Sequence, residues 1–126
     1  MRRILLIDDE ESVLKMLKTF FERQGFDVEV ATDGGIGLAI NLKSRVDIVV
    51  TDILMPHKEG FETIREFRLE FPDVKIIAIS GGGRNGADTY LEFAKSFGAD
   101  KTFAKPFDLS ELRDAVDELL GLEKVS

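Results

Sequence analysis

The segment IVVTDILMP, residues 48–56, decides how this sequence can fold and where its chemistry can lie. Its first four residues, 48–51, are all β-branched, which is typical of a fully buried strand. The run ends on Asp52, and a buried carboxylate is costly unless a cation or hydrogen-bond donors stabilise it. The segment therefore predicts an interior strand with a functional aspartate at its carboxyl end.

Similar apolar runs recur along the chain, separated by stretches of helical periodicity. The predicted strands cover residues 4–7, 28–31, 48–51, 74–79 and, more weakly, 102–104. Predicted helices, with apolar residues three and four positions apart, cover about residues 13–21, 36–42, 61–71, 88–97 and 109–119. Gly25 is expected to end the first helix, and Asp108, with Glu111 three residues on, to cap the last.

Strands that alternate with helices cannot be hairpin neighbours, so the strands should lie parallel with right-handed crossovers. The near-continuous apolar character of the strands predicts helices on both faces of the sheet. We therefore expect an α/β fold: a single doubly wound (βα)5 domain over residues 1–126.

The composition limits the classes of partner and compartment. A chain of 126 residues with 44% apolar and 33% charged residues fits one globular domain. Its formal net charge of -7 argues against binding nucleic acid or anionic lipid by electrostatics alone. It has no cysteine, and its N-terminal apolar run is too short for a signal peptide or a membrane span. We expect a cytoplasmic protein that does not bind membranes.

Polar residues occur at the carboxyl ends of four of the predicted strands. They are Asp8, Asp9, Asp52, Ser80 and Lys105. In an open parallel sheet these ends share one edge, and ligands bind where the strand order reverses. The sequence therefore predicts one site at this edge.

The residue types at this edge indicate the chemistry. Three carboxylates with no His or Cys nearby suit a hard cation, and room for water favours Mg²⁺ over Ca²⁺. Asp52 could be a metal ligand, a nucleophile that forms an aspartyl phosphate, or both. Lys105 would supply positive charge and Ser80 a hydrogen-bond donor to a phosphoryl group.

Four segments, LLIDDEE, IVVTDILMPHKEGFE, IIAISG and AKPF, occur in this order and together resemble the receiver domain of two-component response regulators (CheY-like). The resemblance runs from Arg3 to about Leu120 and implies a flavodoxin-like sheet of order 2-1-3-4-5. It implies a phosphoacceptor that assists its own phosphorylation and dephosphorylation and is not an enzyme with a separate product.

The resemblance also assigns roles to single residues. Asp52 would be the phosphoacceptor, Asp9 a direct Mg²⁺ ligand, Asp8 a ligand through water, and the backbone carbonyl of Leu54 a further ligand. Ser80 and Lys105 would bind the phosphoryl group, and the peptide bond between Lys105 and Pro106 would be cis.

Partners follow from the resemblance as well. The phosphoryl donor would be a histidine kinase or a phosphotransfer protein. The surface of the fourth helix, fifth strand and fifth helix would bind a downstream effector protein, or a C-terminal output domain missing from this sequence.

One position departs from the family pattern. Receivers usually carry Tyr or Phe three residues before the lysine, as a ring that follows the Ser/Thr movement, whereas this chain has Thr102. Phe103 is adjacent, but neighbouring strand residues face opposite sides of a sheet. The phosphorylation chemistry is unaffected, and the usual aromatic readout is in question.

Alternative interpretations exist for the same residues. Asp8 and Asp9 could simply cap the first helix, and Lys105 could be a solvated charge. The chain could be a pseudo-receiver, an interaction module that never takes phosphate. Gly81, Gly83 and Gly86 match a dinucleotide-binding pattern, although on the fourth strand and without the following acid.

We favour a mobile glycine loop after Ser80 over nucleotide binding. The single histidine, His57, is interpreted as solvated.

Overall fold

The computed structural model describes residues 2–53, 59–80 and 87–122. Within them strands and helices alternate as predicted, and the predicted boundaries are correct to within two residues. In chain order the elements are β1 (Arg3–Ile7), α1 (Glu11–Arg23), β2 (Asp27–Ala31), α2 (Gly34–Lys43), β3 (Ile48–Asp52), α3 (Glu59–Glu70), β4 (Lys75–Ser80), α4 (Ala87–Phe97), β5 (Lys101–Ala104) and α5 (Leu109–Leu120).

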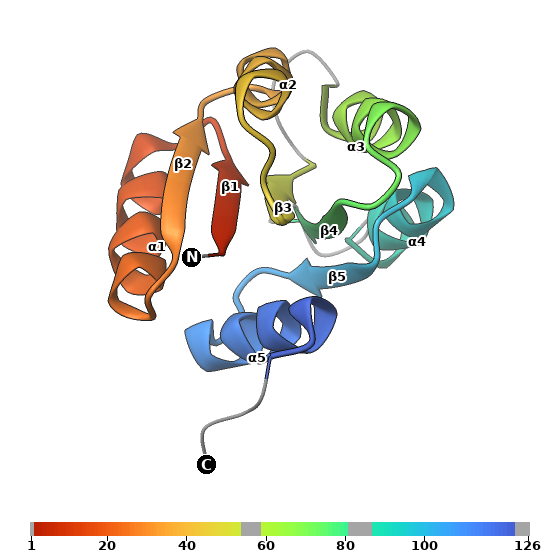
Figure 1. The fold of residues 1–126 in the computed structure, drawn as a ribbon. Helices are drawn as coiled ribbons and strands as arrows, with labels where there is room; N and C mark the ends of the chain where they lie inside the picture. Colours follow the sequence, from red (N-terminus) through yellow and green to blue (C-terminus); the bar gives the residue numbers. More distant parts are fainter. Residues whose placement is uncertain (1, 54–58, 81–86, 123–126) are drawn as a thin grey trace.

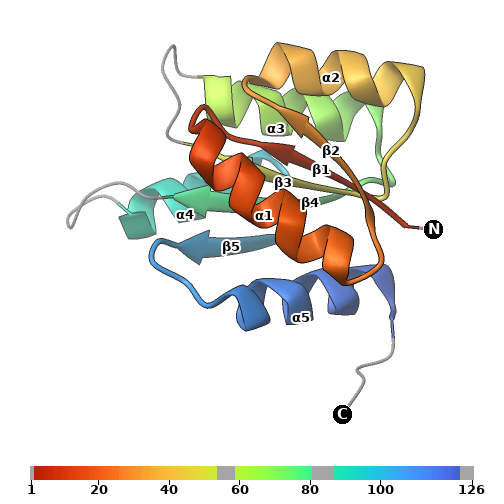
Figure 2. The same cartoon turned by 90° about the vertical axis from the view of Figure 1, so that its left-hand side faces the viewer.

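The strands form one parallel sheet of order β2-β1-β3-β4-β5, which confirms the expected topology. Helices α1 and α5 cover one face, and α2, α3 and α4 cover the other (Figures 1 and 2). The strand order reverses between β1 and β3, so their carboxyl ends form the point at which such sheets bind ligands.

Alternate residues of each strand build two separate cores. On β1, Ile4 and Leu6 pack with residues of α1 and α5, whereas Leu5 and Ile7 pack with residues on the α2, α3 and α4 side. All four are almost completely buried. Burial of both faces is the physical reason for the continuous apolar strands in the sequence, and it fixes the direction in which each strand end presents its next residue.

The helix ends show which local predictions hold. Helix α1 ends before Gly25, whose φ of 94° lies in the left-handed region that glycine favours. Helix α2 begins two residues earlier than predicted because Asp33 caps it, accepting a hydrogen bond from the Ile36 N–H at 2.8 Å. Asp108 is at the N-cap of α5, but its side chain accepts no cap hydrogen bond, so the predicted capping interaction is wrong.

No helix in the described ranges is long and apolar enough to cross a lipid bilayer.

Candidate functional site

Asp52 is the last residue of β3, and only 5% of its surface is exposed. The chain after it is held on both sides. The Ile53 N–H donates to the Ile79 carbonyl at 2.9 Å, and Gly60 of α3 packs against the Ile53 backbone. A Cβ on Gly60 would lie 2.4 Å from Ile53 Cα, so only glycine allows this approach. The first turn of α3 therefore fixes the backbone next to Asp52.

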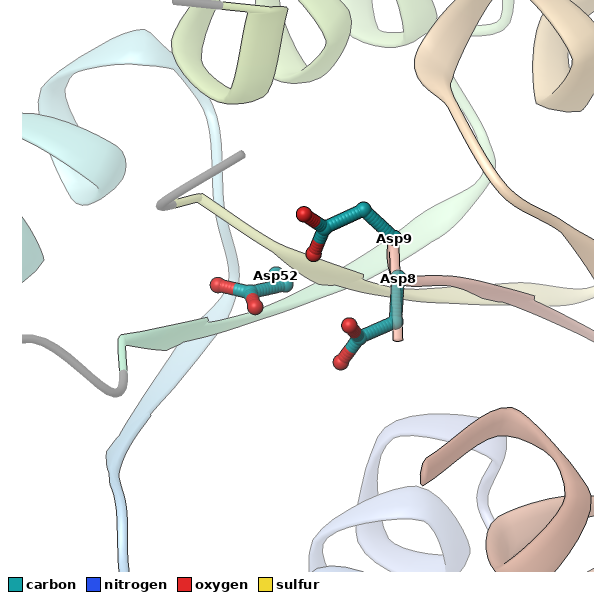
Figure 3. Close-up of side chains that lie close together, drawn as sticks. All are labelled: Asp8, Asp9 and Asp52. Atoms are coloured by element: carbon teal, nitrogen blue, oxygen red, sulfur yellow. The ribbon is translucent and has the colours of Figure 1, made fainter. Parts of the chain in front are cut away.

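Asp8 and Asp9 follow β1, which pairs with β3 so that Ile7 lies opposite Thr51. Figure 3 shows the side chains of Asp8, Asp9 and Asp52 gathered at these two strand ends. One carboxylate oxygen from each lies within 4.8 Å of the others. The structure thus brings together the three acids that the sequence placed at one sheet edge.

The two acids after β1 differ in environment. Asp8 is buried, and its Oδ1 accepts a hydrogen bond from the Glu10 N–H at 2.9 Å, whereas Asp9 is exposed. Glu10 precedes α1 and occupies its N-cap position. Asp8 therefore stabilises the turn before the helix, and the alternative in which it caps α1 is not supported.

Lys105 follows β5 and points between two of the acids. Its Nζ lies 3.5 Å from Asp8 Oδ2 and 3.5 Å from Asp52 Oδ2. Its backbone N–H donates to the Ser80 carbonyl at 2.9 Å, and the peptide bond to Pro106 is cis, as expected. Its position is that of a bridging cation in the site, so the solvated alternative is wrong.

The electrostatics of the site follow from this packing. Burial raises the pKa of Asp8, and the neighbouring carboxylates of Asp52 and Asp9 add to the rise. The Glu10 N–H and the Lys105 ammonium oppose it without cancelling it. For Lys105, burial lowers the pKa, but the attraction of Asp52 and Asp8 raises it by more. Lys105 is therefore positively charged at neutral pH, and it only partly compensates the buried carboxylates.

We expect Asp8→Asn to stabilise the metal-free protein. Because the pKa of Asp8 is raised in the folded state, folding stability falls as pH rises from about 3.9, the unfolded value, to the folded pKa. Asn removes this loss and still accepts the Glu10 hydrogen bond. Thermal unfolding in chelator at neutral pH should show a higher Tm, by about 4 °C per kcal/mol recovered. An Asp8→Asn variant that unfolds at a lower temperature would contradict this interpretation.

Ser80 is the last residue of β4 and is 1% exposed. Its Oγ has no hydrogen-bond partner among the described residues. The neighbouring Ile79 pairs with Asp52, so the hydroxyl lies at the same sheet edge. A buried hydroxyl without a partner costs about 1–3 kcal/mol. Such a group is suited to donate to an acceptor that enters the site.

The donor set fits a magnesium ion. Three carboxylates within reach of one point, two of them buried, offer only hard oxygen ligands. Asp9, Asp52 and Asp8 are the residues that would hold such an ion. Leu54, whose carbonyl was expected as a ligand, lies outside the described residues.

Thr102 and Phe103 face opposite sides of the sheet, as expected for neighbours on β5. Thr102 pairs with Ala78, which belongs to the core on the α2, α3 and α4 side. Phe103 packs with the α1 and α5 core, and its ring lies 5.9 Å from that of Phe107. Phe103 therefore does not take the place of the ring that the family pattern has at Thr102.

Two groups of predicted residues lie outside the described part of the chain. They are the glycine loop of Gly81, Gly83 and Gly86, and the histidine His57. Conversely, the structure adds Glu10, whose charge raises the pKa of Lys105. The third acid in the segment DDE was the sequence signal for it.

Comparison with known proteins shows the family of this chain. The family model of the response regulator receiver domain matches residues 4–117. Sporulation initiation phosphotransferase F of Bacillus subtilis is 31% identical over 121 residues, covering 96% of this chain and 95% of that protein. Transcriptional regulatory protein RprY of Bacteroides fragilis is 32% identical and covers 94% of this chain, which spans only 49% of RprY.

Solved structures agree with these relatives. A response regulator receiver domain protein from Clostridium thermocellum has a TM-score of 0.87 at 28% identity, with 96% of this chain and 95% of that chain covered. The response regulator TrrA from Thermotoga maritima, solved in complex with Mg²⁺-BeF, has a TM-score of 0.82 at 31% identity, with 94% and 99% covered.

Proposed function

The chain belongs to the response regulator receiver family, and from this premise we propose that it relays a two-component signal by accepting a phosphoryl group on Asp52. The observation that carries the proposal is the arrangement of the site. Lys105 bridges Asp8 and Asp52 at 3.5 Å, and the unpartnered hydroxyl of Ser80 lies at the same sheet edge.

The proposed step is a phosphoryl transfer from a phosphohistidine of a histidine kinase or phosphotransfer protein. A carboxylate oxygen of Asp52 attacks phosphorus, a P–O bond forms and the P–N bond breaks. The electron pair returns to the imidazole nitrogen, which takes a proton from solvent. The chain then holds an aspartyl phosphate, and its own residues assist both the gain and the loss of the phosphoryl group.

Different residues of the site stabilise different parts of the transferred phosphoryl group. Lys105 leaves its contact with Asp52 and binds a phosphoryl oxygen, and Ser80 Oγ donates to another. A bound Mg²⁺, held by Asp8, Asp9, Asp52 and the Leu54 carbonyl, would neutralise the remaining phosphoryl charge. That TrrA was solved with Mg²⁺-BeF supports this assignment for the present chain.

We place the output on the face of α4, β5 and α5. A phosphoryl group drawn towards Ser80 and Lys105 favours one arrangement of the β4 and β5 ends, and the helices beside them carry the change to a partner. Thr102 lacks the ring of the usual readout, so the movement of these strand ends would itself be the signal.

The partner is a downstream effector protein or an output domain of the same protein. The chain covers almost all of the sporulation phosphotransferase but half of RprY, so the relatives offer both arrangements. We place the protein in the cytoplasm. The acidic cluster of Asp8, Asp9 and Asp52, together with Ser80 and Lys105, argues against a pseudo-receiver.

Intact mass after incubation with a small acyl phosphate donor tests the proposal. With Mg²⁺ we expect the mass of one phosphoryl group to be added, and we expect no addition in excess chelator. A chain that stays unmodified in Mg²⁺, although circular dichroism shows it folded, would move the assignment to the pseudo-receiver.

We expect Ser80→Ala to separate a functional hydroxyl from a structural one. Because the buried Oγ has no partner among the described residues, its removal should not destabilise the protein and should raise the free energy of unfolding, by up to about 1–3 kcal/mol. The rate of phosphorylation should fall about tenfold to a hundredfold through loss of a donor to the transferring group.

Ser96→Ala is the matched control for this variant. The Ser96 hydroxyl is exposed and donates to the Phe93 carbonyl on α4 at 2.7 Å. We expect this variant to be phosphorylated at the wild-type rate. Equal rates for both variants would exclude Ser80 from the reaction.

A further inference from the structure

A cavity lies at the edge of the sheet formed by the amino ends of the strands, opposite the edge that holds Asp52. Figure 2 shows that the chain starts and α5 ends at this edge. It has a volume of about 330 Å³, which falls within the range of small-molecule sites, about 300–1,000 Å³. Six residues of its lining carry the argument: Arg2, Asn41, Arg45, Phe71, Lys75 and Leu119. None of them belongs to the phosphorylation site.

The cationic side chains of this cavity are free of ion pairs within the described part of the chain. Arg2, Arg45 and Lys75 form no ion pair with any described residue, although Arg3 and Arg68 nearby are paired. Two carboxylates, Asp47 and Asp73, also line the cavity, which leaves one net positive charge on a chain of net charge -7. This positive balance favours an anionic ligand.

One of the carboxylates is already engaged, which strengthens the preference. Asp47 Oδ2 accepts a hydrogen bond from the Arg3 N–H at 2.8 Å. The Arg45 guanidinium lies over the Phe71 ring, 5.8 Å from its centroid, and so is held at the cavity wall. A phosphate dianion matches such a group of cations better than a carboxylate does.

Asn41 adds a hydrogen-bond donor to the cavity wall. Asn41 lines the cavity, is 1% exposed, and accepts a hydrogen bond from the Val46 N–H through Oδ1 at 2.7 Å. Its amide nitrogen donates no hydrogen bond to any described residue. Among the described residues, Ser80 Oγ is the one fully buried side-chain polar atom without a partner, so the Asn41 nitrogen is not fully enclosed and can donate to an acceptor on a molecule in the cavity.

We propose that this cavity binds a small organic phosphate of about mononucleotide size. Its phosphate lies among Arg2, Arg45 and Lys75, an acceptor on its body takes the Asn41 amide hydrogen, and its apolar part packs on Leu119. The site is at the opposite edge of the sheet from Asp52, so this inference stands or falls independently of the proposed phosphorylation.

A ¹⁵N–¹H NMR titration with adenosine 5′-monophosphate and ribose 5-phosphate tests the proposal, with adenosine and inorganic phosphate as the half-ligands. At least one organic phosphate should shift the Asn41 side-chain amide and Val46 resonances saturably below about 5 mM, a concentration typical of weak metabolite sites. Each half-ligand should bind at least about tenfold more weakly, because it makes only part of the contacts.

Charge variants assign the binding to this cavity. Arg45→Gln and Lys75→Gln should each weaken binding of the organic phosphate about fivefold to tenfold. Lys43 lies at the carboxyl end of α2, near Asn41, but it does not line the cavity. Lys43→Gln should therefore leave binding of the organic phosphate unchanged. The proposal is overturned by no saturable shift with either organic phosphate, by equal binding of inorganic phosphate, or by equal loss in all three variants.

Discussion

Asp52→Asn should abolish formation of the aspartyl phosphate, with a loss of more than about a thousandfold in rate, because an amide oxygen is a very poor nucleophile. The substitution keeps the size and shape of a side chain that is 5% exposed at the end of β3. It also leaves Lys105 paired with Asp8 at 3.5 Å. Loss of activity would therefore come from the chemistry and not from unfolding.

Asp33→Asn provides the matched control for this substitution. Asp33 caps α2 through its side chain, and Asn is an equally good cap, so the same change of chemistry is made away from the site. Phosphoryl incorporation from an acyl phosphate donor is measured as mass against time. Incorporation by the Asp52→Asn variant at the wild-type rate would mean that another carboxylate, such as Asp8 or Asp9, is the acceptor.

Lys105→Gln is expected to reduce both stability and phosphorylation. It leaves the carboxylates of Asp8 and Asp52 without the cation that lies 3.5 Å from each. Breaking a fully buried pair costs about 3–5 kcal/mol; because the Lys105 side chain is 24% exposed, we expect a smaller loss, about 2 kcal/mol. The phosphorylation rate should fall about a hundredfold, because the Lys105 ammonium no longer stabilises the negative charge of the phosphoryl group during transfer.

Lys101→Gln is the comparison that isolates the site. Lys101 pairs with Glu118 at 2.9 Å on the surface, where Glu118 is 68% exposed, so its loss should cost no more than about 1 kcal/mol. Urea unfolding in chelator measures both variants, and Mg²⁺ should restore part of the stability of Lys105→Gln only. Equal stability of the two variants would show that the bridging contacts contribute nothing.

The order and type of the helices and strands could be predicted because the residues that become buried recur with a regular spacing in the sequence. Residues 48–51 are recognisable as a buried strand since both of its faces are covered. The exceptions have local causes. The start of α2 was missed because Gly34 and Gly35 are poor helix formers, and the Asp33 cap compensates for them. That β1 and β3 lie side by side was predicted from the family resemblance and not from the hydrophobic pattern.

The composition of the site could be predicted, but its energetics could not. Asp8 and Asp9 are adjacent identical residues, but in the structure the first is buried and accepts a hydrogen bond from the Glu10 N–H, whereas the second is exposed. The bridge from Lys105 to both Asp8 and Asp52 depends on the pairing of β5 with β4, which the sequence does not encode locally.

The cavity at the amino ends of the strands could not be predicted from the sequence. Asn41 has the pattern of an ordinary polar residue of a helix, and its burial results from the turn that brings the Val46 N–H to its side chain. A single polar residue does not disturb the hydrophobic periodicity of a helix. The burial of Asn41 can therefore be recognised only in the folded structure.

The most direct test of the central claim is to locate the modified residue chemically. Borohydride reduces an aspartyl phosphate to homoserine, so the phosphorylated protein is reduced, digested and sequenced by mass spectrometry. We predict homoserine at position 52 when Mg²⁺ is present, and none when it is chelated. Homoserine at position 8 or 9, or an added phosphoryl mass that yields no homoserine at position 52, would contradict the account.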